Sequence, residues 1–582
     1  MPFPRAGIPV SVLGPPQFLA TRAANKIDFS SSNTSNRISW NHVLAPSRLL
    51  VTQTDQKRAH APSARFAFLV AAGIFLSRIF GLVRDRVFAH YFGNSDAADA
   101  FKAAFRIPNF LQNLFGEGVL SASFIPVYAN LLAKNDEEEA NRTAGAVAAL
   151  LALTTSLLVL LGVLATPYLI DAIAPGFHGE KRELTIRLVR ILFPGAGLLV
   201  FSAWCLGILN SHRRFFLPYV APVIWNMAMI ATLWGFGRRY EQYPLAVILA
   251  WGSVAGSALQ VLVQLPTVMR LLGKFRVTFR DPFGNVKTVV RNFVPVFIGR
   301  GVLQISAYVD ALLASLLPTG AVAALSYAQT LYTLPVSLFG MSISAAELPV
   351  MSGTIGEESE VAEILRKRLN YGLRQIAFFV IPSIAAFLIL GDVIVSAIYQ
   401  SGQFHHADAI YVWGILAGAN VGLLASTFGR LYSSTYYALR DTRTPLRYAI
   451  IRVVLTTILG YLCAVPLPPA LGIESRWGVA GLTISAGVAS WVEFLLLRRT
   501  LSRRIGSTGA PASYLAKLWA AALLSAALAW LIHRFAGLRS HILEAVIVLG
   551  PYGVLYFVLA SAFGLGEARQ LFDRVAGFLR RA

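Results

Sequence analysis

Apolar residues recur in long runs between about residues 66 and 566, and short polar connections separate the runs. A helix that crosses a ~30 Å hydrocarbon core needs roughly 20 mostly apolar residues, and most of the runs reach that length. The pattern predicts an all-α polytopic membrane protein with about fourteen transmembrane helices. The predicted spans lie at about residues 66–91, 98–132, 143–173, 185–209, 217–236, 244–271, 288–317, 320–350, 371–399, 407–437, 445–467, 475–497, 513–535 and 541–564.

The composition supports this fold class. Of the 582 residues, 56% are hydrophobic and 14% are charged, which leaves too little charged surface for a soluble protein of this length. The two cysteines, Cys205 and Cys463, are far apart within predicted spans, so we expect neither a disulfide framework nor a cysteine metal site.

The net charge of +22 is unevenly distributed along the chain. Basic residues cluster in alternate short connections, an arrangement that follows the positive-inside rule and places both termini in the cytoplasm. The pair Arg238–Arg239 is an exception, since it falls in a connection predicted to lie outside. The excess charge predicts contact with anionic membrane lipids and no nucleic-acid partner.

Four regions follow from these patterns. Residues 1–63 are rich in Pro, Ser, Asn and Arg and contain no apolar core typical of a secretory signal. They are predicted to form a disordered cytoplasmic leader; the alternatives are a start site assigned too early and a targeting role. Residues 64–273 form a first lobe of six spans, 274–500 a second lobe of six, and 501–582 two final spans with an amphipathic tail.

Short motifs suggest that the two lobes are related. Leu114-Phe115-Gly116 in the second span has a counterpart in Leu338-Phe339-Gly340 of the eighth, roughly 225 residues later, and each motif precedes a Pro-Val pair. In transporters built from repeats, the substrate usually binds between them.

Charged residues in the first predicted span are the strongest functional signal. Arg78 and Asp85 are seven residues apart and share one helix face, and Arg84 points roughly 120° away. A charge at the bilayer centre costs roughly 2.5–3.5 kcal/mol, so these residues are predicted to line a cavity. The alternatives are a structural ion pair and arginines that extend to the membrane surface, which suits Arg84 better than Arg78.

The second predicted span carries Asp99, Lys102, Arg106, Asn109 and Glu117. Lipid would not tolerate these charges, so the helix is predicted to face protein or a wet cavity. A proline in mid-span frees a backbone carbonyl, which Asn109 or water could satisfy. For Asp99 an alternative holds equally well, since an acid in a first turn stabilises the dipole of its own helix.

In the second lobe, Arg300 is the best candidate for a further cavity cation, and Asp310 lies ten residues after it. Glu493 is expected to pair with Arg498 if it has no functional role. The pair His405-His406 lacks nearby carboxylates, which argues against a metal site.

A cavity with several arginines and few acids favours an anionic ligand, because guanidinium groups bind phosphates through paired hydrogen bonds. We therefore expect a phospholipid or a lipid-linked diphosphate. The sequence contains no phosphate-binding glycine loop, nucleophile elbow or pair of acids at hydrolase spacing. It therefore predicts a transporter that uses no cofactor and no metal, and not an enzyme.

The stretch Ser77–Asp85, with Asp99-Ala100-Phe101, Pro108-Asn109, Phe115–Gly118 and Asp441–Pro445, resembles the MurJ (MviN) family over about residues 65–570. The resemblance implies the multidrug/oligosaccharidyl-lipid/polysaccharide exporter fold, with two six-helix lobes and two further helices that form a groove for a lipid tail. It also implies an activity in peptidoglycan biosynthesis: flipping of lipid II, the undecaprenyl-diphosphate-linked precursor, across the bacterial cytoplasmic membrane.

Residue by residue, the resemblance extends to Arg78, Arg84, Asp85, Asp99, Asn109 and Glu117, which match positions in the family's central cavity. This sequence departs from the family at two positions, where Gln112 and Thr330 replace cavity arginines. Arg106, Lys102 or Arg300 is expected to supply the missing charge.

The sequence therefore predicts a lipid II flippase that works by alternating access, driven by membrane potential, protons or another ion. Because of the two departures, two alternatives stay open. One is a flippase for another undecaprenyl-diphosphate-linked saccharide. The other is a transport-dead paralogue that acts as a scaffold for cell-wall synthesis proteins.

Overall fold

The computed structural model describes residues 64–568, apart from 274–283, 355, 537 and 539. The predicted leader, the first ten residues of the predicted second lobe and most of the predicted tail lie outside the described residues. Within the described part of the chain the regular elements are all helical, which confirms the all-α prediction.

The first half of the described chain contains nine helices, several of which are separated by single residues. They are α2 (Ala64–Phe92), α3 (Asp96–Phe115), α4 (Glu117–Ser123), α5 (Ile125–Ala133), α6 (Glu137–Leu164), α7 (Thr166–Ile173), α8 (Gly179–Ser211), α9 (Phe216–Phe236) and α10 (Gln242–Leu272).

The second half contains the remaining helices, including one π-helical turn, η1, and one 3₁₀ turn, η2. They are α11 (Asn285–Ser315), α12 (Ala321–Pro335), η1 (Val336–Met341), α13 (Ser342–Ser352), α14 (Glu358–Ile389), α15 (Gly391–Tyr399), α16 (His406–Asn420), α17 (Leu423–Ala438), α18 (Arg443–Ala464), α19 (Leu467–Ala470), η2 (Ser475–Trp477), α20 (Gly478–Ile505), α21 (Ala512–Ala536) and α22 (His541–Ala562).

Each of the fourteen predicted spans is helical over most of its length. Among the described residues, ten helices are long and apolar enough to cross a membrane, or eleven if α16 and α17, which meet at a 44° bend, count as one span. The stretch predicted as one span at 98–132 is instead three helices, because Gly116 adopts an extended backbone that interrupts the hydrogen bonding between α3 and α4.

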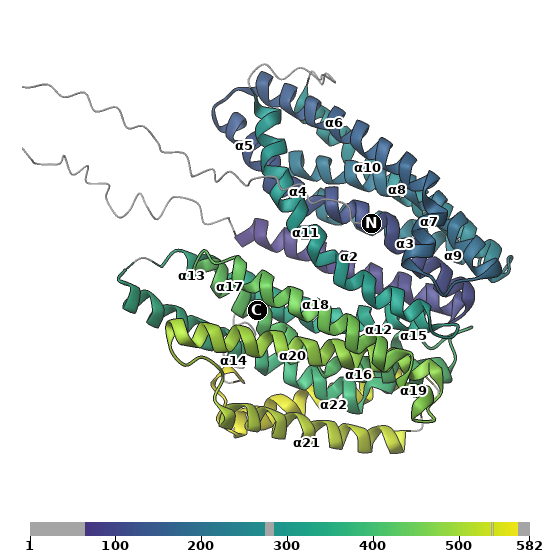
Figure 1. The fold of residues 1–582 in the computed structure, drawn as a ribbon, viewed down its shortest axis with the longest axis vertical. Coiled ribbons are helices and arrows are strands. Elements are labelled where there is room, and N and C mark those ends of the chain that lie inside the picture. Colours follow the sequence, from purple (N-terminus) through teal and green to yellow (C-terminus); the bar gives the residue numbers. More distant parts are fainter. Residues whose placement is uncertain (1–63, 274–283, 355, 537, 539, 569–582) are drawn as a thin grey trace, which may run out of the picture. The chain divides into compact units, whose positions relative to one another are not determined.

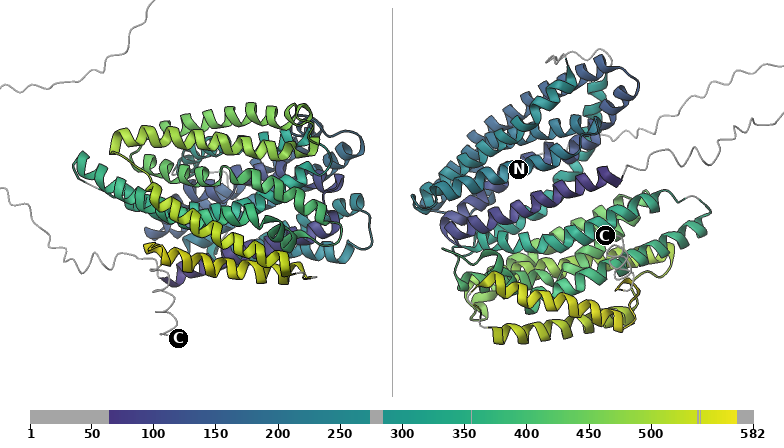
Figure 2. Two further views of the ribbon diagram at one scale, coloured as in Figure 1. Left: turned by 90° about the horizontal axis from the view of Figure 1, so that it is seen from below. Right: turned by 180° about the vertical axis from the view of Figure 1, so that it is seen from behind.

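The helices pack as two groups in the part of the chain that begins at residue 64 (Figures 1 and 2). In the first group α8 packs against α3, α6 and α10, and α9 packs against α2 and α10. In the second group α20 packs against α16, α17 and α18, α12 packs against α16, and α14 packs against α17 and α21. The last helices, α21 and α22, pack against each other, and α22 also contacts α15.

Two helices lie along the boundary between the groups. α2 contacts α15 as well as α9, and α11 contacts α3 and α4 on one side and α12 and α18 on the other. The predicted limits of the lobes, at residues 273 and 500, stay a prediction.

The bend between α16 and α17 depends on glycine. A Cβ atom on Gly422 would lie 2.5 Å from the Cα atom of Gly487 in α20, and one on Gly487 would lie 2.8 Å from the backbone nitrogen of Gly422. Small residues at such contacts allow helix backbones to approach closely within a membrane.

We therefore expect Gly487→Leu to lower the stability of the protein by about 1–3 kcal/mol, the usual cost of overpacking a tight contact. The measurement is the thermal unfolding midpoint of purified protein in detergent. The control is Gly550→Leu in α22, where no heavy atom lies within 4 Å of the added Cβ. Equal midpoints for the two variants would contradict the role assigned to the glycine contact.

Candidate functional site

A cavity of about 540 Å³ lies where α2, α3, α11 and α12 meet. Most of its lining residues have polar or charged side chains. The lining residues are Arg78, Gly81, Leu82, Arg84, Asp85, Lys102, Phe105, Arg106, Asn109, Asn113, Tyr308, Ser326, Gln329, Thr330, Thr333 and Leu334.

Helical spacing explains why these side chains share a cavity. On α3, Lys102, Arg106, Asn109 and Asn113 follow each other at intervals of three or four residues, so they form one face of the helix. On α12, the residues at 326, 329, 330 and 333 lie at intervals of three, one and three, which also places them on one face. The cavity therefore lies between two polar helix faces, one from each group of helices.

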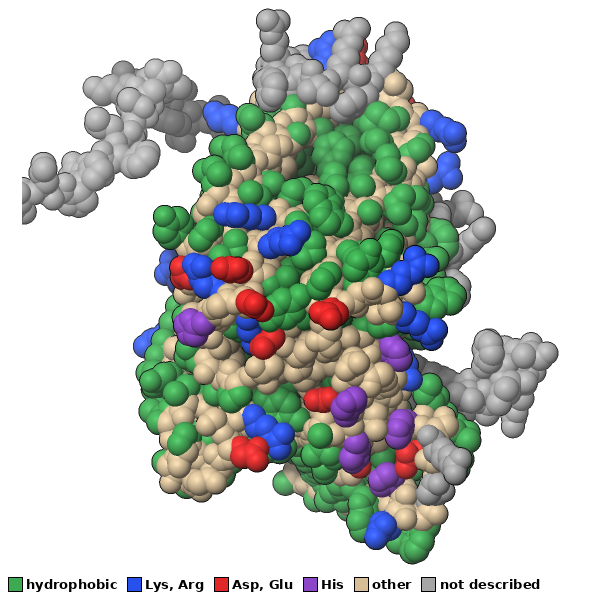
Figure 3. Space-filling model, turned by 90° about the vertical axis from the view of Figure 1, so that its right-hand side faces the viewer, with side chains coloured by type: hydrophobic (Ala, Val, Ile, Leu, Met, Phe, Trp, Pro, Cys, Tyr) green, Lys and Arg blue, Asp and Glu red, His purple; other side chains and the backbone are tan. Residues whose placement is uncertain are grey.

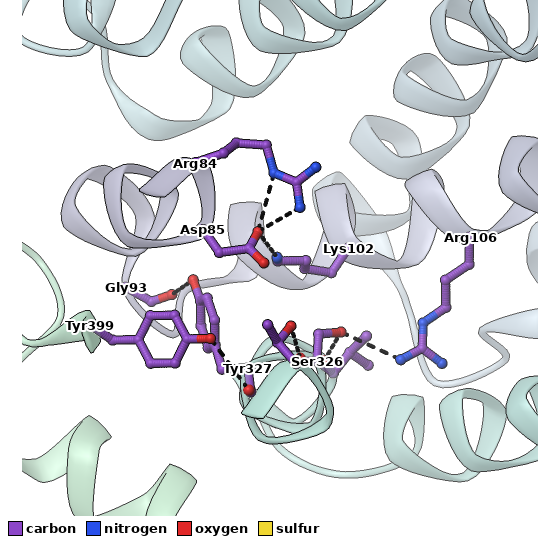
Figure 4. Close-up of polar contacts among 10 residues, drawn as sticks. Arg84, Asp85, Gly93, Lys102, Arg106, Ser326, Tyr327 and Tyr399 are labelled. Atoms are coloured by element: carbon purple, nitrogen blue, oxygen red, sulfur yellow. Dashed lines mark hydrogen bonds and ion pairs between the residues drawn. The ribbon is translucent and has the colours of Figure 1, made fainter. Parts of the chain in front are cut away.

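At one end of the cavity the acid Asp85 lies between two cations (Figure 4). Its Oδ1 atom lies 3.0 Å from Nη2 of Arg84 and 3.3 Å from Nζ of Lys102, and its side chain is 7% exposed. Aromatic rings cover the same cations: the Arg84 guanidinium lies 5.0 Å from the ring of Trp225, and Lys102 Nζ lies 4.7 Å from the ring of Phe88. Asp85 thus holds both cations at the cavity wall.

The charge of the lining is unbalanced. It contains four basic side chains, Arg78, Arg84, Lys102 and Arg106, and Asp85 is the acid among its residues. A site with this excess of cations in a membrane attracts anions, because interactions between charges strengthen where water is scarce.

Arg106 joins the two groups of helices. From α3 it donates hydrogen bonds to Oγ of Ser326, at 3.4 Å (Figure 4), and to Oε1 of Gln329, at 3.1 Å, both on α12. The Tyr308 hydroxyl of α11 donates to the backbone carbonyl of Arg106 at 2.7 Å. Arg106 therefore brings a cation next to Thr330, one of the two positions at which this sequence departs from the family pattern.

The structure places Asp99 away from this lining. Its side chain is 1% exposed, and its two oxygens accept hydrogen bonds from the backbone N–H groups of Gly320, at 2.8 Å, and Ala323, at 2.7 Å. Those groups belong to the N-terminus of α12, so Asp99 caps a helix of the other group. Lys181 Nζ of α8 lies 2.7 Å from the same carboxylate.

Neighbouring residues extend this contact. Lys181 also pairs with Asp96 at 2.8 Å, and Asp96 accepts a hydrogen bond from Thr319 at 2.9 Å. We refer to Asp96, Asp99, Lys181, Thr319, Gly320 and Ala323 as the Asp99 cluster.

Other hydrogen bonds join the two groups at the same end. Tyr327 of α12 donates to the carbonyl of Gly93 at 3.0 Å, and the backbone N–H of Gln403 donates to the carbonyl of His90 at 2.8 Å. Arg86 donates to two carbonyls near the end of α15. Basic, acidic and histidine side chains gather on the face seen in Figure 3. The cavity is thus closed at the end of α2 that leads into α3.

The predicted site residues separate into three sets. Arg78, Arg84, Asp85, Arg106 and Asn109 line one cavity together, and Asp99 lies in the Asp99 cluster instead. The side chains of Glu117 and Arg300 lie outside the described residues. Of the two departures from the family pattern, Thr330 lines the cavity, and Gln112 is not among the lining residues.

Sequence reasoning missed several polar lining residues: Asn113, Tyr308, Ser326, Gln329 and Thr333. The helical spacing of the polar residues on α12 was the available signal for three of them.

The expected pairing of Glu493 with Arg498 is wrong. Glu493 pairs with Arg452 of α18 at 3.1 Å, because α18 and α20 pack along each other. Arg498 instead donates a hydrogen bond to the carbonyl of Thr508.

Comparison with known proteins gives a consistent result. The family model described as "Lipid II flippase MurJ" matches residues 88–549. The lipid II flippase MurJ of Burkholderia cenocepacia is 30% identical over 532 residues, which cover 89% of this chain and 99% of that protein. The probable lipid II flippase MurJ of Rhizobium tropici is 32% identical over 445 residues, which cover 75% and 80% of the two chains.

Solved structures show the same fold. A lipid II flippase MurJ in an inward closed conformation superposes with a TM-score of 0.70 at 25% identity, covering 87% of this chain and all of that chain. An inward-facing multidrug resistance transporter of the MATE family, from the MOP superfamily, gives a TM-score of 0.61 at 19% identity, covering 76% of this chain and all of that chain. The second likeness concerns the fold alone.

The Asp99 cluster predicts a conformational effect. Asp99→Asn removes the negative charge that faces Lys181 and leaves one side-chain oxygen, instead of two, to accept hydrogen bonds from the N-terminus of α12. A hydrogen bond to a charged group contributes roughly 1.5–3 kcal/mol. We therefore expect the population of conformations in which the two groups of helices are apart at this end to increase roughly tenfold or more. The measurement is the distance distribution between spin labels at positions 168 and 473, in a variant without other cysteines.

The matched control is Asp171→Asn, which removes an exposed acid paired with Arg182 at 2.7 Å in the same part of the chain. Exposed pairs contribute little, so this variant should keep the parent distribution. If Asp99→Asn also keeps it, the Asp99 cluster does not hold the groups together.

Proposed function

The chain belongs to the MurJ family of lipid flippases, and on that premise we propose that it carries lipid II from the inner to the outer leaflet of the bacterial cytoplasmic membrane. As a family member it is a multi-pass membrane transporter and not an enzyme. The observation that supports the proposal most directly is the cationic cavity between the two groups of helices, which has the charge that a diphosphate requires.

The diphosphate of the substrate binds the basic residues of the cavity. Arg78, Arg84 and Arg106 offer planar guanidinium groups that fit phosphate oxygens in pairs, and Lys102 adds a point charge. Asp85 orients two of these cations and limits their mutual repulsion while the cavity holds no anion. Asn109 and Asn113 add neutral polar groups at the next turns of α3.

The substrate enters from the side where α2 begins. The alternate basic connections support a cytoplasmic location for that side and for both chain termini. In this orientation the Asp99 cluster closes the cavity toward the outside. Movement of the two groups against each other then exposes the headgroup outside while the prenyl tail stays in lipid. In this cycle the carboxylate of Asp99 separates from the N-terminus of α12 and returns to it.

The membrane potential suits such a cationic cavity as a driving force. One elementary charge that moves through 100 mV gains about 2.3 kcal/mol. An inside-negative potential draws the empty, positively charged cavity back toward the cytoplasmic side. A bound diphosphate offsets that charge during the outward step.

The test is rescue of bacteria depleted of their own lipid II flippase, with externally accessible lipid II measured alongside the amount of this protein in the membrane. We expect the parent chain to restore both growth and exposed lipid II. Arg84→Ala and Arg106→Ala should each reduce exposed lipid II by roughly tenfold or more, because each removes a charged hydrogen-bond donor from the site.

Arg142→Ala is the control, because Arg142 forms an exposed pair with Glu138 within α6. It should retain parent activity. The proposal fails if the well-expressed parent does not restore exposed lipid II, and the headgroup assignment fails if Arg84→Ala and Arg106→Ala behave like Arg142→Ala.

A further inference from the structure

A second cavity, of about 630 Å³, lies far along the chain from the first. It lies where the first half of α14, the start of α21 and the end of α22 come together. Its lining residues are Lys367, Asn370, Tyr371, Arg374, Gly509, Pro511, Ser513, Tyr514, Lys517, Gly564, Leu565, Gly566 and Glu567.

The lining is a regular polar face and not a chance group of surface residues. The four residues from α14, at positions 367, 370, 371 and 374, repeat at intervals of three, one and three, which places them on one side of the helix. Ser513 and Lys517 are four residues apart on α21 and face the same cavity.

The cavity lies at the level where polar surface changes to apolar surface. α14 is rich in charged residues up to Arg374 and continues from Ile376 as an apolar helix. α21 begins at Ala512, and α22 ends at Ala562. Tyr371 and Tyr514 both line the cavity, and tyrosine is enriched where a membrane meets water.

The charges in the cavity are mainly positive. Lys367, Arg374 and Lys517 face Glu567, the acid among the described lining residues. Each cation has a defined position: Lys517 Nζ donates to the carbonyl of Phe563 at 3.0 Å, and Lys367 Nζ lies 2.7 Å from Oε1 of Glu363.

Arg374 is held in a way that suits phosphate binding. Its guanidinium carbon lies 5.4 Å from the centre of the Tyr514 ring, and the Tyr514 hydroxyl donates to the backbone carbonyl of Arg374 at 3.3 Å. An arginine that lies over an aromatic ring keeps the N–H groups at the edge of its guanidinium plane available, and these groups can donate paired hydrogen bonds to phosphate oxygens.

We propose that this cavity binds the phosphate headgroup of an anionic phospholipid. Basic pockets between transmembrane helices on the cytoplasmic side suit such headgroups. The apolar parts of α14 and α21 continue from the cavity into the membrane, and Leu523, Leu524 and Leu528 of α21 have exposed side chains there. A soluble anion would use the cations alone, whereas a phospholipid also uses this apolar surface.

The bound lipid links separate elements. Its headgroup contacts α14, which belongs to the second group of helices, together with α21 and the segment after α22. The site shares no lining residue with the cavity around Arg84. The proposal therefore does not depend on which substrate the protein transports.

The test is native mass spectrometry of the full-length protein, titrated in detergent with phosphatidylglycerol or with phosphatidylcholine. We expect phosphatidylglycerol to bind at least tenfold more tightly, since phosphatidylcholine carries no net charge. The double variant Arg374→Gln/Lys517→Gln should lower that affinity at least tenfold. Arg374→Gln alone should lower the affinity for phosphatidylglycerol severalfold. This single variant keeps the Lys517 contact with Phe563, so its effect cannot come from a weakened end of α22.

The matched control is Arg499→Gln/Arg503→Gln, which removes two positive charges from the end of α20, outside the cavity lining. It should bind phosphatidylglycerol like the parent protein. An equal loss of affinity in both double variants would overturn the proposal, because it would mean that phosphatidylglycerol binding depends only on the overall positive charge of this side of the protein.

Two further results would also overturn the proposal. One is equal binding of phosphatidylglycerol and phosphatidylcholine. The other is displacement of phosphatidylglycerol by millimolar inorganic phosphate, which would show that the cavity holds a soluble anion. The readout is lipid binding and not transport, so a failure here is distinct from a failure of lipid II rescue.

Discussion

A carboxylate that is buried in a membrane protein is stable only if cations or hydrogen-bond donors contact it, and those that contact Asp99 belong to helices α8 and α12. Its side chain is 1% exposed, and its charge is compensated by Lys181 of α8 and by two backbone N–H groups of α12. Removing one partner from a buried ion pair is strongly destabilising. The requirement to satisfy this one acid therefore fixes where α12 lies against α3, and with it the closed end of the cavity.

Helix α3 connects that closed end to the cationic cavity. Lys102 lies one turn after Asp99 on α3, and Arg106 lies one turn further, where it contacts Gln329 of α12. A movement that separates α3 from α12 must break both the Asp99 cap and the Arg106 contact. An anion that competes with Gln329 for Arg106 thus weakens one of the contacts that keep this end closed. This gives substrate binding a direct physical route to the conformational change.

The sequence predicted the helices and several cavity residues, but it did not predict the contacts between helices that are distant along the chain. Hydrophobic runs located the helices, and charges in apolar runs identified Arg78, Arg84, Asp85, Arg106 and Asn109, because both signals depend on neighbours within a few turns. Asp99 was explained equally well by the dipole of its own helix, yet it caps α12, more than 220 residues away. The pairing of Glu493 with Arg452 was missed for the same reason, since helical periodicity contains no information about which helices become neighbours.

The two basic cavities differ in the groups that contact their cations. In the first, Asp85 pairs with Arg84 and Lys102, so the diphosphate that we propose as its ligand competes with an internal acid for these two cations. That competition weakens binding and allows the substrate to be released, as a transporter requires. In the second, Lys367 pairs with Glu363, but Lys517 contacts a backbone carbonyl and Arg374 lies over a ring, so an anion approaches two cations that neutral groups hold. Such a site favours a ligand that stays bound, which is what a structural lipid does.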